Sequence, residues 1–233
     1  MSIYTISDLH LPLGIDKPMD IFGRKWENYV ERIRENWLNT VSPEDTVVLG
    51  GDFSWATYLE QSKKDFEFLE ALPGTKILLK GNHDYWWTTA SKLAQFTENE
   101  GFTTVKFLHN NSYKAENTGI CGTRGWSLDS LSSDEDKKIY ARELIRLRIS
   151  LDDAKNKNCE ELIVFTHYPP VTQAAQNTEF HKILREYGVK KCIYGHLHGA
   201  SHNTAFTGFA EDIEYILAAG DYLDFEPLLI KGE

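Results

Sequence analysis

Short apolar runs rich in β-branched residues recur along the chain, and each is followed by polar residues. The runs lie at residues 3–6, 46–49, 76–79, 162–165 and 191–194. None of them alternates between apolar and polar positions, which is the pattern of strands that are buried on both faces. We therefore predict five buried strands at these positions.

Helical patterns lie between several of these strands. Two sets of apolar residues have helical spacing, namely Val30, Ile33, Trp37 and Val41, and Tyr140, Leu144, Leu147, Leu151 and Ala154. Each set forms one apolar stripe on an α-helix and predicts packing against a core. Further helices are predicted at 58–72, 88–97 and 178–187. The dense basic run at 137–148 is interpreted as the solvated face of a helix.

Two segments have a pattern typical of antiparallel β-structure. Residues 103–122 and 213–230 contain short strand-like pieces separated by turn residues. In the first segment, Asn110-Asn111 predicts a hairpin turn between antiparallel strands. The chain is therefore expected to mix strand–helix alternation with β-rich segments, as an α/β (α+β mixed) protein with a single domain over residues 1–233.

Composition and charge exclude several classes of protein. Hydrophobic residues make up 41% and charged residues 26%, as in ordinary globular proteins. The start of the chain lacks a basic targeting region, and no apolar run approaches a membrane span, so we expect a cytoplasmic protein.

Cys121, Cys159 and Cys192 form no CxxC pair and are expected to be reduced. A net charge of −10 disfavours nucleic-acid binding. Nothing in the sequence indicates the oligomeric state.

Each predicted strand is followed by residues that can bind a metal ion. In chain order these are Asp8 and His10, then Asp52, then Asn82, His83 and Asp84, then His167, and finally His196 and His198. Because the loops at the carboxyl ends of strands line the crevice of open α/β sheets, we expect these side chains to converge. Carboxylates and imidazoles gathered without a cation would lose solvation and repel like groups. The sequence therefore predicts a metal centre.

The donor types limit which metal this centre binds. The candidates offer imidazole nitrogens, carboxylate oxygens and one amide oxygen but no thiolate, which excludes a structural zinc site of the cysteine type. Mixed nitrogen and oxygen donors favour Mn, Fe or catalytic Zn. Seven side chains exceed the needs of one ion, whereas two ions about 3.5–4 Å apart that share a bridging carboxylate would use them all.

The same residues form an ordered set of motifs. The blocks are Asp8/His10, Gly51-Asp52, Gly81-Asn82-His83-Asp84, a lone His167 after a strand, and Gly195-His196-Leu197-His198. This set resembles the calcineurin-like metallophosphoesterase superfamily. The stretches DLHL, DKPMDIFG, GDFSWA and GTRGW further resemble a small bacterial group of predicted phosphohydrolases. The resemblance implies a four-layer α-β-β-α sandwich with two central mixed sheets.

The resemblance also implies a role for each motif residue. One ion would be held by Asp8, His10 and His198, the other by Asn82, His167 and His196, and Asp52 would bridge the two. A hydroxide between the ions would attack the phosphorus of a phosphomonoester or phosphodiester in line with the leaving oxygen. From the residues themselves we further predict that His83 either protonates that oxygen or stabilises charge there, and that Asp84 orients the His83 imidazole.

Other residues are candidates for binding the substrate, which we expect to be a phosphate-ester small molecule or a nucleotide. Arg124 in GTRGW is suited to clamp a phosphate, and a structural salt bridge explains it equally well. Of the remaining histidines, His202 is the best placed to line the site. The loops at 11–28, 125–136 and 168–180 are expected to rim the pocket.

Two alternatives are different in kind. The first is a non-catalytic scaffold that keeps the fold and binds metal or partner proteins, and such a protein is expected to lose ligands or the catalytic histidine. All seven ligands and His83 are present. The second is a metal-storage or metal-sensing domain, which leaves the His83-Asp84 pair unexplained.

Overall fold

A mixed sheet of five strands, four from the first half of the sequence and one from its end, forms one side of the sandwich. The computed structural model describes residues 1–19, 21 and 23–232. The strand order is β11 (Leu228–Lys231), β1 (Ile3–Ile6), β2 (Thr46–Leu49), β3 (Thr75–Leu79) and β4 (Val105–Leu108). Strands β1 to β4 run parallel, and β11 pairs antiparallel with β1. The strands predicted at 3–6, 46–49 and 76–79 are confirmed.

A second mixed sheet of six strands forms the other half. Its order is β5 (Tyr113–Ala115), β6 (Thr118–Thr123), β7 (Glu161–Thr166), β8 (Lys191–Tyr194), β10 (Ile213–Leu217) and β9 (Gly208–Ala210). Strands β6, β7, β8 and β10 are parallel, whereas β5 and β9 are antiparallel edge strands. The strands predicted at 162–165 and 191–194 are confirmed.

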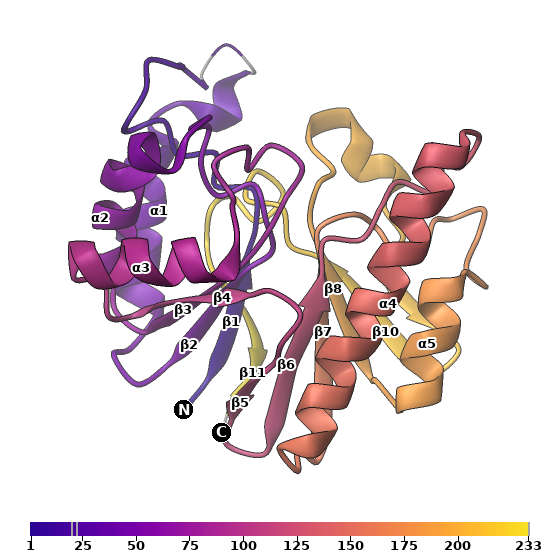
Figure 1. The fold of residues 1–233 in the computed structure, drawn as a ribbon. Helices are drawn as coiled ribbons and strands as arrows, with labels where there is room; N and C mark the ends of the chain where they lie inside the picture. The colour runs from indigo at the N-terminus through magenta and orange to yellow at the C-terminus, as the bar shows by residue number, and fades with distance from the viewer. Residues whose placement is uncertain (20, 22, 233) are drawn as a thin grey trace.

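Helices cover the outer face of each sheet (Figure 1). Helices α1 (Tyr29–Thr40), α2 (Lys63–Glu70) and α3 (Ala90–Glu100) lie on the first sheet, and α4 (Asp134–Asn156) and α5 (Glu179–Tyr187) lie on the second. Short 3-10 turns occupy Arg24–Trp26, Leu59–Ser62 and Gly199–Thr204. The expected four-layer sandwich is therefore confirmed. No helix in the described part of the chain is long and apolar enough to cross a membrane.

Three apolar layers hold the sandwich together, and alternation along the strands creates them. On β2, Val47 and Leu49 pack outward with Ile33 and Trp37 of α1, whereas Val48 points to the inner layer between the sheets. Because successive side chains of a strand point to opposite faces, a strand covered on both sides must be apolar throughout. This is why the runs in the sequence do not alternate.

The hairpin predicted at Asn110-Asn111 is wrong. Strand β4 pairs parallel with β3, and β5 pairs antiparallel with β6, so these two asparagines connect the two sheets. The side chain of Asn111 accepts a hydrogen bond from the backbone N–H of His109 (2.6 Å), and Asp153 of α4 binds the backbone N–H of Ser112 (2.7 Å). These contacts direct the chain away from β4 and onto the second sheet.

Candidate metal centre

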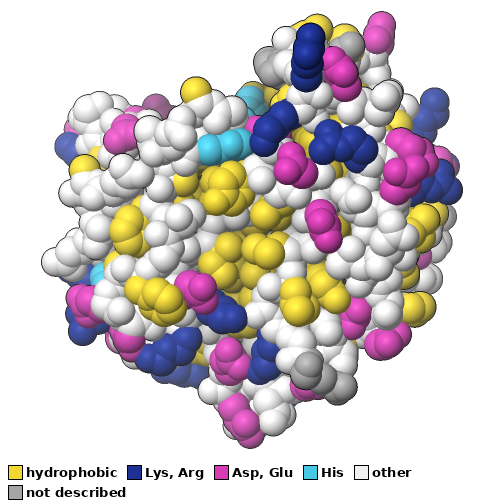
Figure 2. Space-filling view, turned by 180° about the vertical axis from the view of Figure 1, so that it is seen from behind, with side chains coloured by type: hydrophobic (Ala, Val, Ile, Leu, Met, Phe, Trp, Pro, Cys, Tyr) yellow, Lys and Arg dark blue, Asp and Glu magenta, His cyan; other side chains and the backbone are white. Residues whose placement is uncertain are grey.

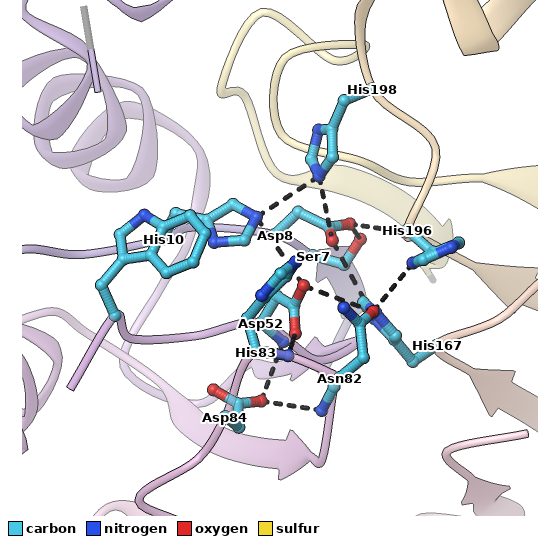
Figure 3. A network of polar contacts seen from close by, with 12 residues as sticks. Ser7, Asp8, His10, Asp52, Asn82, His83, Asp84, His167, His196 and His198 are labelled. Atoms are coloured by element: carbon cyan, nitrogen blue, oxygen red, sulfur yellow. Dashed lines mark hydrogen bonds and ion pairs between the residues drawn. The ribbon is translucent and has the colours of Figure 1, made fainter. Parts of the chain in front are cut away.

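The seven predicted ligands meet at the carboxyl ends of strands from both sheets (Figure 3). The first sheet contributes Asp8 and His10 after β1, Asp52 after β2, and Asn82 after β3; the second contributes His167 after β7, and His196 and His198 after β8. The centre therefore spans the junction between the two halves of the sandwich.

Two groups of side chains in this centre have ligand atoms close enough to share an ion. In the first, Asp8, His10 and His198 offer atoms that all lie within 4.8 Å of one another; in the second, Asp8, Asp52 and His167 do the same. The Nε2 atoms of His10 and His198 are 3.3 Å apart. The Oδ2 atom of Asp52 lies 3.5 Å from His167 Nε2. Asp8 belongs to both groups.

The side chain of Asn82 joins the remaining two histidines. Its Oδ1 atom lies 2.6 Å from Nε2 of His167 and 2.8 Å from Nδ1 of His196. Two imidazole nitrogens thus point at one amide oxygen. The three side chains expected around the second ion are therefore assembled at one place.

Several buried atoms of this centre lack a hydrogen-bond partner within the described residues. They include Asp8 Oδ1 and Asp52 Oδ2, on side chains that are 0% and 1% exposed. A buried carboxylate oxygen without a partner is costly, and native proteins rarely leave one unless an ion or water binds it. The positions of these oxygens beside imidazole nitrogens fit divalent or trivalent ions with mixed nitrogen and oxygen ligation.

The backbone is strained where it presents these ligands. Asp8, His10, Asp52 and His196 have φ values of 59°, 46°, 52° and 71°, in the left-handed region that side chains other than glycine disfavour. Backbone hydrogen bonds hold the turn, because the N–H of Asp8 donates to Gly51 O (2.8 Å) and that of His10 donates to Asp52 O (2.9 Å). Such strain is typical of functional sites.

Two of the motif glycines are required for close approach. A Cβ atom on Gly81 would lie 2.0 Å from Asp52 Oδ1, and one on Gly195 would lie 2.3 Å from Asp8 Oδ2. No side chain fits at either position. The glycines of the GNHD and GHxH motifs therefore make room for the two carboxylates.

Burial and neighbouring charges shift the pKa values of the side chains in this centre in different directions. Burial, together with the negative charge of Asp8, raises the pKa of Asp52 to about 8. Burial and the nearby His167 lower the pKa of His196 to about 4. Burial opposes the protonation of His198, but Asp8 and Asp221 outweigh it and raise its pKa to about 10. Asp8 and His198 thus behave as an ion pair, and a bound cation would replace that proton.

Sequence reasoning missed Asp221, which supports this centre from behind His198. Its Oδ1 accepts a hydrogen bond from Nδ1 of His198 (2.8 Å), and its Oδ2 accepts one from the backbone N–H of Gly199 (3.0 Å). The side chain is buried. Asp221 belongs to no motif, and its only signal is its position shortly after the end of β10. His202 also lies against it, with Nε2 3.3 Å from Asp221 Oδ1.

Asp84 does not orient the imidazole of His83, contrary to the expectation from sequence. Its two oxygens accept hydrogen bonds from the backbone N–H groups of Asp52, Phe53, Ser54 and Gly81 and from Nε1 of Trp86. All of its strong acceptor positions are therefore occupied. Asp84 instead holds the loop that carries Asp52 in place.

His83 lies at the open side of the centre. Its ring contacts that of Trp55 (centroids 4.8 Å apart), and its backbone N–H donates to Asp52 Oδ1 (2.7 Å). Its Nδ1 has no partner within the described residues. Burial, His167 and Lys17 lower the pKa of His83. The side chain borders a cavity of about 560 Å³ whose walls include Trp26, Trp55 and His198.

The loops that were expected to rim the pocket border cavities beside the centre. Met19 and residues 23–26 line the cavity next to His83. Residues 127–129, 168–169 and 171–174 line another of about 380 Å³ next to His196. Arg124 lines a third cavity together with Lys80, and its guanidinium lies 4.6 Å from the centre of the Trp126 ring. No carboxylate among the described residues forms a salt bridge with Arg124.

Comparison with known proteins bears on the nature of this centre. The family model described as "calcineurin-like phosphoesterase" matches residues 1–200. No curated protein is similar enough to match the chain.

Solved structures are similar in fold. A protein of unknown function, AQ665 from Aquifex aeolicus, has 20% identity and a TM-score of 0.51, and the alignment covers 98% of this chain and 95% of that one. Phosphopantetheinyl hydrolase (PptH) from Mycobacterium tuberculosis has 11% identity and a TM-score of 0.54, with coverage of 100% and 96%. TT1561 from Thermus thermophilus has 13% identity and a TM-score of 0.53, with coverage of 84% and 81%.

Proposed function

Because the chain belongs to the calcineurin-like phosphoesterase family, we propose that it is a hydrolase that uses two metal ions to cleave phosphomonoesters or phosphodiesters. The observation that carries the proposal is that one oxygen each of Asp8 and Asp52, neither of which accepts a hydrogen bond, lies among histidine nitrogens in one buried centre. A buried group of this composition is suited to cations and to the phosphate oxygens that cations attract.

We assign the ligands as the motif resemblance implies. Asp8, His10 and His198 would hold one ion, Asn82, His167 and His196 would hold the other, and Asp52 would be shared by both. Mn, Fe and Zn all accept this mixture of donors. When bound, such ions neutralise phosphoryl oxygens and provide an activated water at neutral pH.

His83 acts on the leaving group in this proposal. Its position at the edge of the centre, facing the cavity lined by Trp26 and Trp55, lets the imidazole bind the leaving oxygen of a phosphate ester. The negative charge of a bound phosphate ester favours the protonated imidazole, so a proton is available for the leaving oxygen as the P–O bond breaks. Trp55 stacks on His10 (4.5 Å between centroids) and so positions both imidazoles.

The proposed substrates are small phosphate esters, including nucleotides. The cavities beside the centre are of a size that suits small molecules, at about 380 to 560 Å³. One structural neighbour is named a phosphopantetheinyl hydrolase, which is consistent with hydrolysis of a phosphate ester by this fold.

The test is a metal titration followed by an activity screen. Metal-free protein is titrated separately with Mn²⁺, Fe²⁺ and Zn²⁺, and the loaded protein is assayed with p-nitrophenyl phosphate, bis-p-nitrophenyl phosphate and a nucleotide panel. We expect two equivalents of metal and turnover of at least one class of ester. The Asp52→Asn variant should lose both properties, whereas Asp134→Asn, at an exposed position, should keep them.

The outcomes separate the alternatives. Uptake of two ions without turnover of any phosphate ester would favour the non-catalytic scaffold. Turnover with a single equivalent of metal would contradict the two-ion centre.

A further inference from the structure

A cavity of about 430 Å³ lies between the carboxyl ends of β3, β4 and β6 and the first half of α4. Its lining includes the charged and titratable side chains Lys80, His109, Arg124, Arg142, Glu143 and Arg146. Arg142 is exposed, and Lys80, Arg124 and Arg146 are partly buried. We call this cavity the basic pocket.

Positive charge in the basic pocket exceeds negative charge. Four of its side chains are cationic, and the only carboxylate in its lining is that of Glu143. Glu143 is fully buried. Its carboxylate already accepts hydrogen bonds from Thr123 Oγ1 (2.5 Å) and Arg146 Nη1 (2.6 Å). Within the described residues, no carboxylate is in salt-bridge distance of Lys80, Arg124 or Arg142. Among the described residues, these three cations therefore have no direct ion pair.

This excess is a local feature of an acidic protein. The chain carries a net charge of −10, and on the side opposite to that of Figure 1 the Lys and Arg side chains are mixed with Asp and Glu (Figure 2). Burial lowers the pKa of Arg124, and Glu143 offsets this only in part. Grouping cations in a partly buried cavity costs free energy through repulsion and desolvation, and a bound anion removes that cost.

The backbone connects the basic pocket to the metal centre. Lys80 directly precedes Gly81 and Asn82 in the sequence. The carbonyl of Arg124 accepts hydrogen bonds from the backbone N–H groups of His167 (3.1 Å) and Tyr168 (3.0 Å). Two cations of the basic pocket, Lys80 and Arg124, are thus tied through the backbone to the proposed metal ligands Asn82 and His167.

We propose that the basic pocket binds a second phosphate group of the substrate, one that is not hydrolysed while the first lies at the metal centre. This inference rests on the proposed function and narrows its substrate class to molecules with two separate phosphate groups. Guanidinium groups pair with phosphate oxygens in a bidentate manner, and Lys80 supplies a third positive charge.

The basic run at 137–148 lies on α4, and its basic residues are exposed or partly exposed, as the sequence pattern predicts. The sequence pattern assigns that run to the solvated face of a helix, and Lys138 is indeed exposed. One helical turn later, Glu143 is buried against Thr123 of β6, and this packing turns Arg142 and Arg146 toward the basic pocket. Two of the basic residues are therefore placed for binding an anion.

The kinetic test compares straight-chain alkanediol bisphosphates with the monophosphates of the same chain lengths, using the metal-loaded enzyme. At the chain length that spans the two sites, we expect the KM of the bisphosphate to be about tenfold below that of the monophosphate, as charge-assisted hydrogen bonds predict. Arg142→Gln and Arg124→Gln should bring this ratio close to one. Lys138→Gln, which removes the same charge from an exposed position on α4, should preserve it.

A binding test is independent of catalysis. Metal-free protein is dialysed against radiolabelled inorganic phosphate, and we expect about one phosphate per chain in the wild type and in Lys138→Gln, with loss of binding in Arg142→Gln and Arg124→Gln. Equal KM values at every chain length, or equal binding by Arg142→Gln and Lys138→Gln, would overturn the proposal. Phosphate binding that depends on Arg142 in a protein without esterase activity would support the pocket and refute the proposed function.

Discussion

The carboxylate of Asp221 accepts a hydrogen bond from Nδ1 of His198 at 2.8 Å, and this contact leaves Nε2 as the free ring nitrogen. The other ring nitrogen, Nε2, then faces Asp8 Oδ1 at 3.4 Å and His10 Nε2 at 3.3 Å. Carboxylates that hold metal-binding histidines in this way typically contribute 10- to 100-fold to metal affinity.

Asp221→Ala should therefore weaken binding of the ion at Asp8, His10 and His198 by about 10- to 100-fold. The measurement is a titration with Mn²⁺ or Zn²⁺ in competition with a chelator of known affinity. Glu226→Ala removes a carboxylate from an exposed position in the same segment and should bind metal as the wild type does. If the two variants have equal affinities, Asp221 does not support the centre.

His83→Ala should discriminate between leaving groups. Without a proton donor at the leaving oxygen, hydrolysis of an alkyl phosphate should slow by about 10²-fold or more, whereas p-nitrophenyl phosphate, whose leaving group needs no proton, should lose much less. The comparison is made through kcat for the two substrates with the same enzyme preparation. Equal losses for both would exclude an acid role for His83.

Asp84→Asn should destabilise the fold. The new NH₂ group would face N–H donors that now bind a carboxylate, so unfolding in urea, with metal removed, should require about 2–3 kcal/mol less free energy. Asp129→Asn, at a loop position outside the buried core, is the matched control. Unchanged stability with an altered pH profile of activity would instead assign Asp84 to the orientation of His83.

Lys76 provides a test of stability against pH that is independent of the metal centre. Its side chain is fully buried on β3, where Nζ donates to Leu72 O (2.6 Å), and burial lowers its pKa from 10.5 to about 8. Below pH 8 the folded protein therefore carries a desolvated charge, and this cost disappears as the pH rises from about 8 to 10.5.

Lys76→Met should accordingly be more stable than the wild type at pH 7, by up to about 3 kcal/mol, and this gain should shrink towards pH 10.5. Chemical denaturation of both proteins across this pH range measures the difference. Lys106→Met, at an exposed position on β4, should show no such trend. A difference between wild type and Lys76→Met that does not vary with pH would show that the Lys76 pKa is not lowered.

The elements and residues that the sequence predicted correctly are those with strong local signals. Strands such as 46–49 are covered on both faces and are apolar throughout, so their pattern does not depend on their partners. Which strands pair with which is a tertiary matter, and for this reason Asn110-Asn111 resembled a hairpin although it connects two sheets.

The same distinction holds at the candidate site. Asp8, Asp52 and His167 follow strands, so their convergence was predictable from topology. The residues that flank a carboxylate in the sequence do not reveal its hydrogen-bond partners. Asp84 precedes three aromatic residues, yet it accepts hydrogen bonds from the N–H groups of residues 52–54. Asp221 reaches His198 only because β10 pairs with β8, which no local pattern indicates.

Strand β11 pairs with β1, and the segment that leads to it carries Asp221. A ribosome extends the chain from its N-terminus, so Asp8 and His10 emerge long before their supports do. Until residues 213–231 have been made and docked, His198 lacks its anchor and the first strand has an open edge. If the centre binds metal as proposed, a newly synthesised chain therefore completes it only after this last segment has folded against β1 and His198.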